Sequence, residues 1–237
     1  IIGTGATAIQ CVPHLAAAAG QLYVFQRTPS TVDVRGNQPT DQDWAAGVES
    51  GWQQRRIENF QILTAGGQAD EDLVADAWTS ITRKLPVMAG PQDAELADFA
   101  KMDEIRSRID DLVTDPATAE ALKPWYGYFC KRPCFHDAYL QTFNRDNVTL
   151  VDTRGLGVQR LEAGGVVVDD VLYELDCLIF ATGFEVGTDY TRRTGFEVIG
   201  RDGKTLTDKW SDGVRTLHGL HVNGFPNCFI ASIAQSG

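Results

Sequence analysis

The chain has 237 residues, of which 43% are hydrophobic, and it carries a formal net charge of −11 at pH 7. This length and composition predict a globular protein of one or two domains with a sizeable core. The acidic balance argues against nucleic acid or an anionic membrane as a partner, because both need clustered Lys and Arg. No apolar run approaches the roughly 18 residues of a membrane span. Five cysteines, an odd number without a framework spacing, favour a reducing, cytoplasmic location.

The N-terminal residues are typical of a buried strand that ends in a glycine turn and leads into a helix. Gly3, Gly5 and Ala8 form a G-x-G-x-x-A pattern. The first glycine allows a sharp turn, the second lets the backbone approach a pyrophosphate, and the alanine lets the helix pack closely on the strand. The helix N-terminus adds free N–H groups and a partial positive charge. We therefore predict a dinucleotide site formed by Gly3, Thr4, Gly5, Ala6, Thr7, Ala8 and Gln10.

The end of the second predicted strand, residues 22–25, selects the coenzyme. An acidic residue there would bind the ribose hydroxyls of NADH and repel a phosphate, whereas an arginine does the reverse. Arg27 lies 24 residues after Gly3, and no carboxylate occurs between Gly3 and Asp33. The sequence thus predicts NADPH, with Arg27 paired to the 2′-phosphate and the Thr28 hydroxyl beside it. The alternative is a surface arginine next to the turn-forming Pro29.

Between residues 38 and 126 the apolar residues follow a helical spacing. Breakers such as Pro116 divide this stretch into about four amphipathic helices. We expect their apolar stripes to be core and assign no cofactor role to the tryptophans. The stripes include Trp44, Trp52 and Ile57, then Trp78 and Ile81, then Leu96, Phe99, Met102, Ile105 and Ile109.

Strand patterns return after this helical insertion. Residues 147–151 form one predicted strand, Gly164-Gly165 indicates a hairpin, and the continuous apolar run 177–181 predicts a strand covered on both faces. That run closes on Ala181, Thr182 and Gly183, which places a small hinge at the carboxyl edge of a parallel sheet, where ligands bind. An ordinary strand-to-loop turn is the alternative. The fold class is α/β, with a Rossmann-like doubly wound parallel sheet and an all-helical insertion.

Two adjacent cations, Lys131 and Arg132, stand where the insertion returns to the sheet. A lysine suits a phosphate as a point charge, and an arginine offers a planar set of donors to a second anion. A zinc site at Cys130, Cys134 and His136 is disfavoured, because cations separate the cysteines and no second cysteine pair completes a tetrahedral set. We predict no metal site.

Taken together, six segments in the same order resemble the Baeyer-Villiger branch of the class B flavin monooxygenases. They are residues 3–10, 24–29, 130–133, 143–148, 181–184 and 224–227. The resemblance implies a flavoprotein with two dinucleotide-binding domains. Residues 1–37 and 127–184 would form the NADPH domain, residues 38–126 its helical insertion, and residues 185–237 the start of the return into the FAD domain.

In that family NADPH reduces FAD, O2 adds to the flavin, and the flavin peroxide converts a ketone into an ester or lactone. The resemblance implies that Arg27 and Lys131 hold the 2′-phosphate and that Arg132 is the catalytic arginine that stabilises the peroxide. A guanidinium suits that role because it stays charged at working pH. The FAD glycine motif and the family fingerprint would lie upstream of Ile1. We therefore expect an internal piece of a longer protein, inactive by itself.

Other functions remain open at this point. An N- or S-oxidising flavin monooxygenase would share the coenzyme site, and so would an NADPH-binding module without catalysis. A flavoprotein disulfide reductase is disfavoured because the sequence has no C-x-x-C dithiol.

Overall fold

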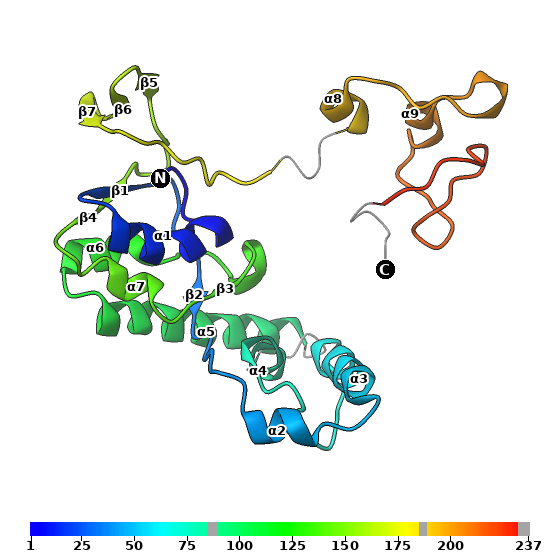
Figure 1. The fold of residues 1–237 in the computed structure, drawn as a ribbon, viewed down its shortest axis with the longest axis horizontal. Coiled ribbons are helices and arrows are strands. Elements are labelled where there is room, and N and C mark those ends of the chain that lie inside the picture. Colours follow the sequence, from blue (N-terminus) through cyan, green and yellow to red (C-terminus); the bar gives the residue numbers. More distant parts are fainter. Residues whose placement is uncertain (85–89, 185–188, 232–237) are drawn as a thin grey trace. The chain divides into compact units, whose positions relative to one another are not determined.

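The computed structural model describes residues 1–84, 90–184 and 189–231. The chain forms two compact units, Ile1–Gly183 and Phe184–Gly237 (Figure 1). Each unit has a hydrophobic core of its own. No helix in the described ranges is both long and apolar enough to cross a membrane.

A parallel sheet lies at the centre of the first unit. Its best-formed pair is β1 (Leu22–Gln26) with β4 (Val148–Asp152). On the other side of β1, Phe25 forms a parallel bridge to Ile2, and Ile2 forms one to Phe180. The order across the sheet is therefore Phe180, Ile2, β1 and β4.

The predicted strand at 177–181 is reduced to this one bridge. Backbone hydrogen bonds of 2.8 Å join Ile2 N to Ile179 O and Ala181 N to Ile2 O. The Phe180 side chain is 59% exposed. The expectation of a strand covered on both faces is therefore wrong for Phe180.

Helix α1 (Ala6–Ala18) follows the glycine turn and packs into the core through Ala8, Ile9, Val12 and Ala16. The side chain of Asn147 donates hydrogen bonds of 2.9 and 2.8 Å to the Ala16 and Ala19 carbonyl oxygens. These bonds satisfy groups that a helix end leaves unpaired. Asn144 does the same for α5 (Pro91–Leu112) through a 2.8 Å bond to Leu112 O. The segment 143–148 thus caps the C-terminal ends of two helices, α1 and α5.

The region predicted to be a helical insertion contains five described α-helices rather than about four. They are α2 (Gln42–Gly47), α3 (Trp52–Thr64), α4 (Ala77–Lys84), α5 and α6 (Pro116–Leu122). The proline breakers at Pro91 and Pro116 stand at the first positions of α5 and α6, where a missing N–H costs nothing.

The additional helix arises because the helical conformation is interrupted between Trp44 and Trp52. Gly51 there adopts a left-handed φ of 82°, a conformation that is unfavourable for residues other than glycine. The two tryptophan rings pack edge to face at 5.4 Å. Trp44 is nevertheless 46% exposed, so the expectation that it is core is wrong.

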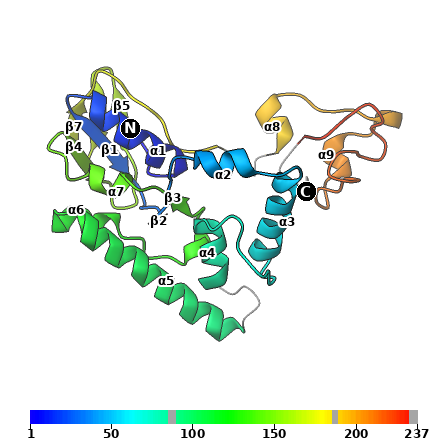
Figure 2. The ribbon, with the colours of Figure 1, turned by 60° about the horizontal axis from the view of Figure 1, so that its bottom comes forward.

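Helix α5 joins the helical region to the sheet. It runs past α6 and α7 (Tyr139–Thr142), with which it is in contact (Figures 1 and 2). Its residues Met102, Ile105 and Ile109 are at most 2% exposed and belong to the same core as α1 and β1. Leu96 and Phe99, nearer its N-terminus, are 65% and 55% exposed, against expectation.

Shorter elements complete the first unit. Strand β2 (Val32–Asp33) pairs in parallel with β3 (Cys134–Phe135), which follows the 3-10 helix η1 (Tyr128–Cys130). Strands β5 (Arg160–Glu162), β6 (Gly165–Val168) and β7 (Val171–Glu174) form an antiparallel sheet. The hairpin predicted at Gly164-Gly165 is confirmed.

The second unit is small and has little regular structure. It contains α8 (Tyr190–Thr194), the short turn η2 (Arg201–Gly203) and α9 (Leu206–Lys209). Leu206, Val222 and Phe225 form its core.

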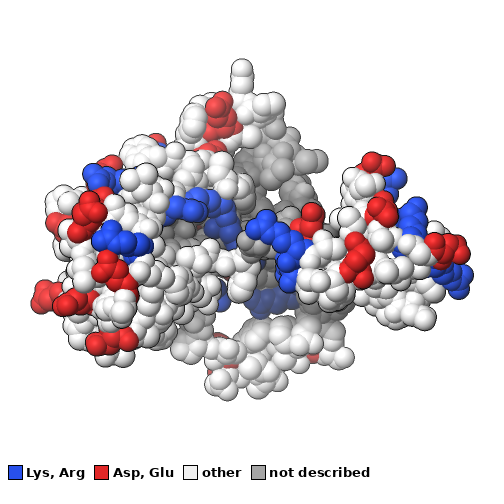
Figure 3. Space-filling view, turned by 90° about the horizontal axis from the view of Figure 1, so that it is seen from above, with Lys and Arg blue, Asp and Glu red and all other residues white. Residues whose placement is uncertain are grey.

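The surface of the chain carries both acidic and basic side chains. On the face of the first unit at the left of Figure 3, acidic and basic side chains are interspersed. Over the whole chain, 32 Asp and Glu against 21 Lys and Arg give the net charge of −11.

Candidate functional site

The glycine turn brings two of the predicted site segments together. Gly3 has a φ of +111°, and a Cβ added to it would lie 2.4 Å from the Ala181 carbonyl oxygen. Neither the conformation nor the space allows another residue without a shift of the backbone. Ala181 is buried against this turn, whereas Thr182 and Gly183 are exposed just beyond it.

The start of α1 is open. Gly5 is its N-cap residue, with no side-chain capping bond, and the first turn contains no acidic residue. A Cβ at Gly5 would meet nothing within 4 Å. Ala6, Thr7 and Gln10 are exposed. The first N–H groups of the helix and its partial positive charge therefore face a space that an anion can enter.

The segment after β1 is tied to the glycine turn. Thr4, which is 5% exposed, donates a 2.9 Å hydrogen bond from Oγ1 to Thr28 O. Gln26 is fully buried, and its Nε2 donates to Ala121 O of α6 at 2.7 Å. These two bonds fix the backbone on both sides of Arg27, whose side chain is exposed. The sequence reasoning did not single out Gln26.

The parallel pairing of β2 and β3 brings Arg27 and Lys131 within electrostatic range of each other. Each cation lies on the segment that leads into one of these strands, and Cys134 N donates to Thr31 O at 3.2 Å where the strands begin. Burial and, second, the charge of Arg27 lower the pKa of Lys131 below its ordinary value. Within the described ranges no carboxylate forms an ion pair with either side chain. An anion bound between them would relieve their mutual repulsion.

Tyr126 lies next to Lys131 and was not predicted from the sequence. The Lys131 ammonium stands 4.8 Å from the centre of the Tyr126 ring. The Tyr126 hydroxyl donates a 2.8 Å hydrogen bond to Pro29 O, and burial raises the pKa of Tyr126 to about 12. An aromatic residue five positions before Lys131 carries no signal by itself, because the contact depends on how β2 and β3 pair.

Arg132 follows Lys131 and is exposed. Its carbonyl oxygen accepts a 3.5 Å hydrogen bond from the Cys134 thiol. Burial raises the pKa of this thiol, and the charge of Arg132 opposes that rise. Among the described residues, Arg132 forms no ion pair. Three pairs of predicted site residues are thus brought together: Gly3 packs against Ala181, Thr4 bonds to Thr28, and Arg27 acts electrostatically on Lys131. No described contact connects the Arg132 side chain to these residues.

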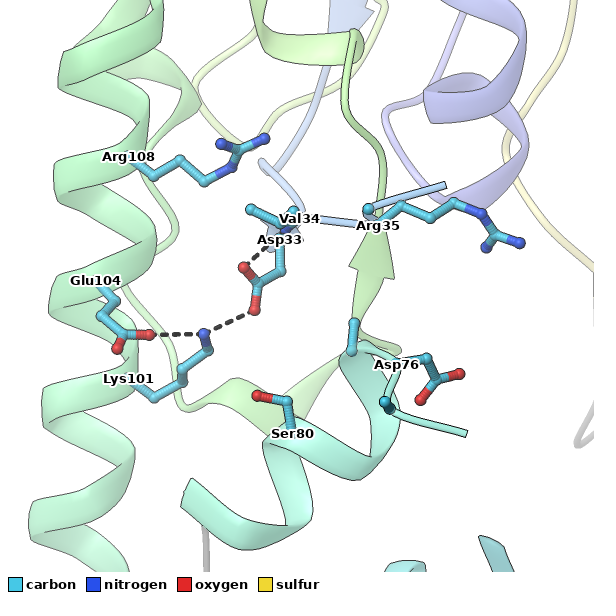
Figure 4. Close-up of a pocket in the computed structure, with 11 residues that line it drawn as sticks. Asp33, Val34, Arg35, Asp76, Ser80, Lys101, Glu104 and Arg108 are labelled. Carbon is cyan, nitrogen blue, oxygen red and sulfur yellow. Dashed lines mark hydrogen bonds and ion pairs between the residues drawn. The ribbon is translucent and has the colours of Figure 1, made fainter. Parts of the chain in front are cut away.

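A pocket of about 540 Å³ lies between α4, α5 and the end of β2 (Figure 4), and none of the predicted site residues lines it. Lys101, 6% exposed, stands 2.7 Å from Asp33 and 2.8 Å from Glu104. Burial alone would lower the pKa of Lys101, but these two carboxylates together raise it above its ordinary value. Arg35 extends away from this cluster. The cluster fastens α5 to β2, a structural role. Among the described side chains, no three His, Cys, Asp or Glu come together as metal ligands.

Comparison with known proteins identifies the family. No protein-family model matches the chain. Neopentalenolactone D synthase of Streptomyces avermitilis is 61% identical over 100% of the chain, and a Baeyer-Villiger monooxygenase of Streptomyces coelicolor is 53% identical over 100% of it. The chain belongs to the Baeyer-Villiger monooxygenase family. It spans 42% and 41% of the lengths of these two relatives.

Solved structures agree with this assignment. Polycyclic ketone monooxygenase from the thermophilic fungus Thermothelomyces thermophila matches 99% of the chain with a TM-score of 0.83 and 41% identity, and the chain covers 42% of it. OTEMO in complex with FAD and NADP matches 94% of the chain with a TM-score of 0.72 and 29% identity, and the chain covers 45% of it. The α/β structure therefore matches part of the Baeyer-Villiger monooxygenase fold, in which FAD and NADP are bound in a solved relative.

Proposed function

We propose that the whole protein, meaning these 237 residues with any sequence that accompanies them, is an FAD- and NADPH-dependent Baeyer-Villiger monooxygenase. It inserts one oxygen atom from O2 next to a ketone carbonyl and yields an ester or lactone. The identity of 61% and 53% to members of this family over the entire chain carries the proposal. No observation on the chain favours N- or S-oxidation, or coenzyme binding without catalysis.

The sheet supports an NADPH-binding domain of Rossmann type, formed by residues 1–37 and 127–184. In chain order the four parallel segments are Ile2, β1, β4 and Phe180, and their order in space is β4, β1, Ile2 and Phe180. This order matches the first four positions of the Rossmann strand order 3-2-1-4-5-6, in which ligands bind where the order reverses, between the first and fourth strands. Gly3 and Ala181 meet there. Residues 38–126 are then its helical insertion, and residues 185–237 belong to the FAD domain.

The residues at this edge fit NADPH. The tight space at Gly3, the open space at Gly5 and the uncapped first turn of α1 form a cradle for the pyrophosphate, lined by Gly3, Thr4, Gly5, Ala6, Thr7, Ala8 and Gln10. Arg27, Lys131 and the Thr28 hydroxyl would hold the 2′-phosphate. Ala181, Thr182 and Gly183 would line the coenzyme beside the turn.

Bound NADPH supplies a hydride to FAD, which then activates O2. Toward this chemistry Arg132 would contribute a planar, positively charged guanidinium that stabilises negative charge developing on oxygen. A lysine at this position would lose its charge more readily on burial.

Replacing Arg27 by alanine is expected to reduce the preference for NADPH over NADH by about 10- to 100-fold, because a charge-assisted bond to the 2′-phosphate is lost. The measurement is kcat/KM for both coenzymes in the whole protein. Arg35→Ala, which removes an exposed arginine beyond β2, is the matched control and should leave the preference unchanged. An Arg27→Ala enzyme with the wild-type preference would refute this coenzyme assignment.

The preference for NADPH should also fall at alkaline pH. Below the lowered pKa of Lys131 its ammonium is charged and attracts the 2′-phosphate. Above that pKa, binding must first take up a proton, so the affinity for NADPH decreases while that for NADH does not. Dissociation constants for both coenzymes between about pH 7 and pH 10 measure this effect. Lys131→Met should make the ratio of the two constants independent of pH, and a ratio that still varies as in the wild type would contradict the role of Lys131.

A further inference from the structure

We propose that Tyr126 is a positioning residue for coenzyme selection, whose ring holds the Lys131 ammonium near Arg27. Its hydroxyl bonds to the turn that follows Arg27 and stabilises the fold there. This inference rests on the proposed preference for NADPH. It also assigns a part in coenzyme recognition to the last residue of the helical insertion.

Both ends of the Tyr126 side chain are engaged at the site. Lys131 Nζ lies 4.8 Å from the ring centre, and the hydroxyl donates a 2.8 Å hydrogen bond to the carbonyl oxygen of Pro29, 97 residues away in the sequence. The Thr4 hydroxyl donates a second hydrogen bond to this turn, at the Thr28 carbonyl oxygen. The turn is therefore clamped between the glycine turn and Tyr126.

Lys131 needs a contact that keeps its ammonium group in place, because the positive charge of Arg27 repels it. A lysine side chain has four rotatable bonds and would swing toward solvent. Burial together with the charge of Arg27 lowers the pKa of Lys131, which shows that the two cations influence each other across the site. The electron-rich face of an aromatic ring attracts an ammonium group.

The chemical nature of this support suits phosphate recognition. A carboxylate would also hold Lys131, but it would neutralise the ammonium and repel the incoming phosphate. The Tyr126 ring carries no net charge, since burial raises the pKa of its hydroxyl to about 12. The ring therefore holds Lys131 without neutralising the charge that would attract the 2′-phosphate of NADPH. NADH has no such group, so Tyr126 contributes to discrimination rather than to binding in general.

The test compares Tyr126 variants of the whole protein with NADPH and NADH as the coenzymes. Tyr126→Leu removes the ring face and is expected to lower the NADPH-to-NADH ratio of kcat/KM by about three- to ten-fold, through a higher KM for NADPH, with NADH little changed. Tyr126→Phe keeps the ring and loses the bond to Pro29 O. It should retain the preference within about two-fold and melt at a lower temperature.

Trp125 provides a matched control. Arg106 stands 4.5 Å from the centre of its ring, so Trp125→Leu removes the same kind of interaction at the neighbouring position, at a cation not assigned to the coenzyme. The preference of this variant should equal that of the wild type.

The outcomes separate this inference from the proposed function. A wild-type enzyme without preference for NADPH, or one whose preference survives Arg27→Ala, overturns the coenzyme assignment itself. If Arg27→Ala acts as expected but Tyr126→Leu keeps the full preference, or raises KM for both coenzymes equally, only the inference about Tyr126 is overturned. If Tyr126→Leu does not fold, Tyr126→Phe decides. A retained preference supports the ring-face role, and a loss as large as that of Arg27→Ala overturns it.

Discussion

Replacing Gly3 by alanine is expected to destabilise the first unit by about 3–5 kcal/mol, which combines backbone strain with overpacking. The added Cβ would lie 2.4 Å from the Ala181 carbonyl oxygen, and the φ of +111° is unfavourable for any L side chain. The atom that the new Cβ meets is a backbone oxygen next to Phe180, so it cannot move aside without disturbing the bridge between Ile2 and Phe180. A loss of this size approaches the whole stability of a typical domain. Chemical denaturation of the whole protein measures it.

Gly5→Ala is the control for this experiment. Gly5 has a φ of −80° and an open surrounding, so the variant should fold with wild-type stability. Its affinity for NADPH should nevertheless decrease, because the new methyl group occupies space that the pyrophosphate would use. If Gly3→Ala unfolds at the same denaturant concentration as the wild type, the turn is not held against Ala181 as described.

Replacing Arg132 by alanine is expected to lower the rate of ester formation by about 10²–10³-fold, the effect of removing one preorganised charge or donor from a transition state. Reduction of the flavin by NADPH should remain largely intact, because in the proposed site Arg27 and Lys131, not Arg132, would hold the coenzyme. Stopped-flow reduction and quantification of the ester product separate the two steps.

Two further variants sharpen the result for Arg132. Arg132→Lys keeps a positive charge but lacks the planar donors, so it should recover only part of the lost rate. Arg154→Ala removes an arginine that is 70% exposed and paired with Asp169, and it should behave as the wild type. Ester formation at the normal rate in Arg132→Ala would remove Arg132 from the mechanism.

The local elements of the site could be predicted from sequence because their causes are local. The spacing of Gly3, Gly5 and Ala8 implies a turn into a helix, and the apolar run at 22–25 implies the strand that follows. Both are present, and so is the hairpin at Gly164-Gly165. The conformation of each depends on a few neighbouring residues and on the steric freedom of glycine.

Burial was harder to predict, as α5 shows. Helical periodicity placed Leu96, Phe99, Met102, Ile105 and Ile109 on one apolar stripe. The last three are buried, while the first two are more than half exposed. Periodicity states that a helix has an apolar face, but the part of this face that is covered depends on where α6, α7 and η1 pack against α5 in the folded chain.

By itself, the sequence determined the glycine turn, the identity of its flanking strands and the cations Arg27, Lys131 and Arg132 as the groups available to anions. Only the tertiary structure decided that Arg27 lies within electrostatic range of Lys131, that the Lys131 ammonium lies over the Tyr126 ring, and that Lys101 binds Asp33 and Glu104. The physical reason lies in strands β2 and β3, which have two residues each. Strands this short leave no pattern in the sequence, yet their parallel pairing brings segments about 100 residues apart side by side.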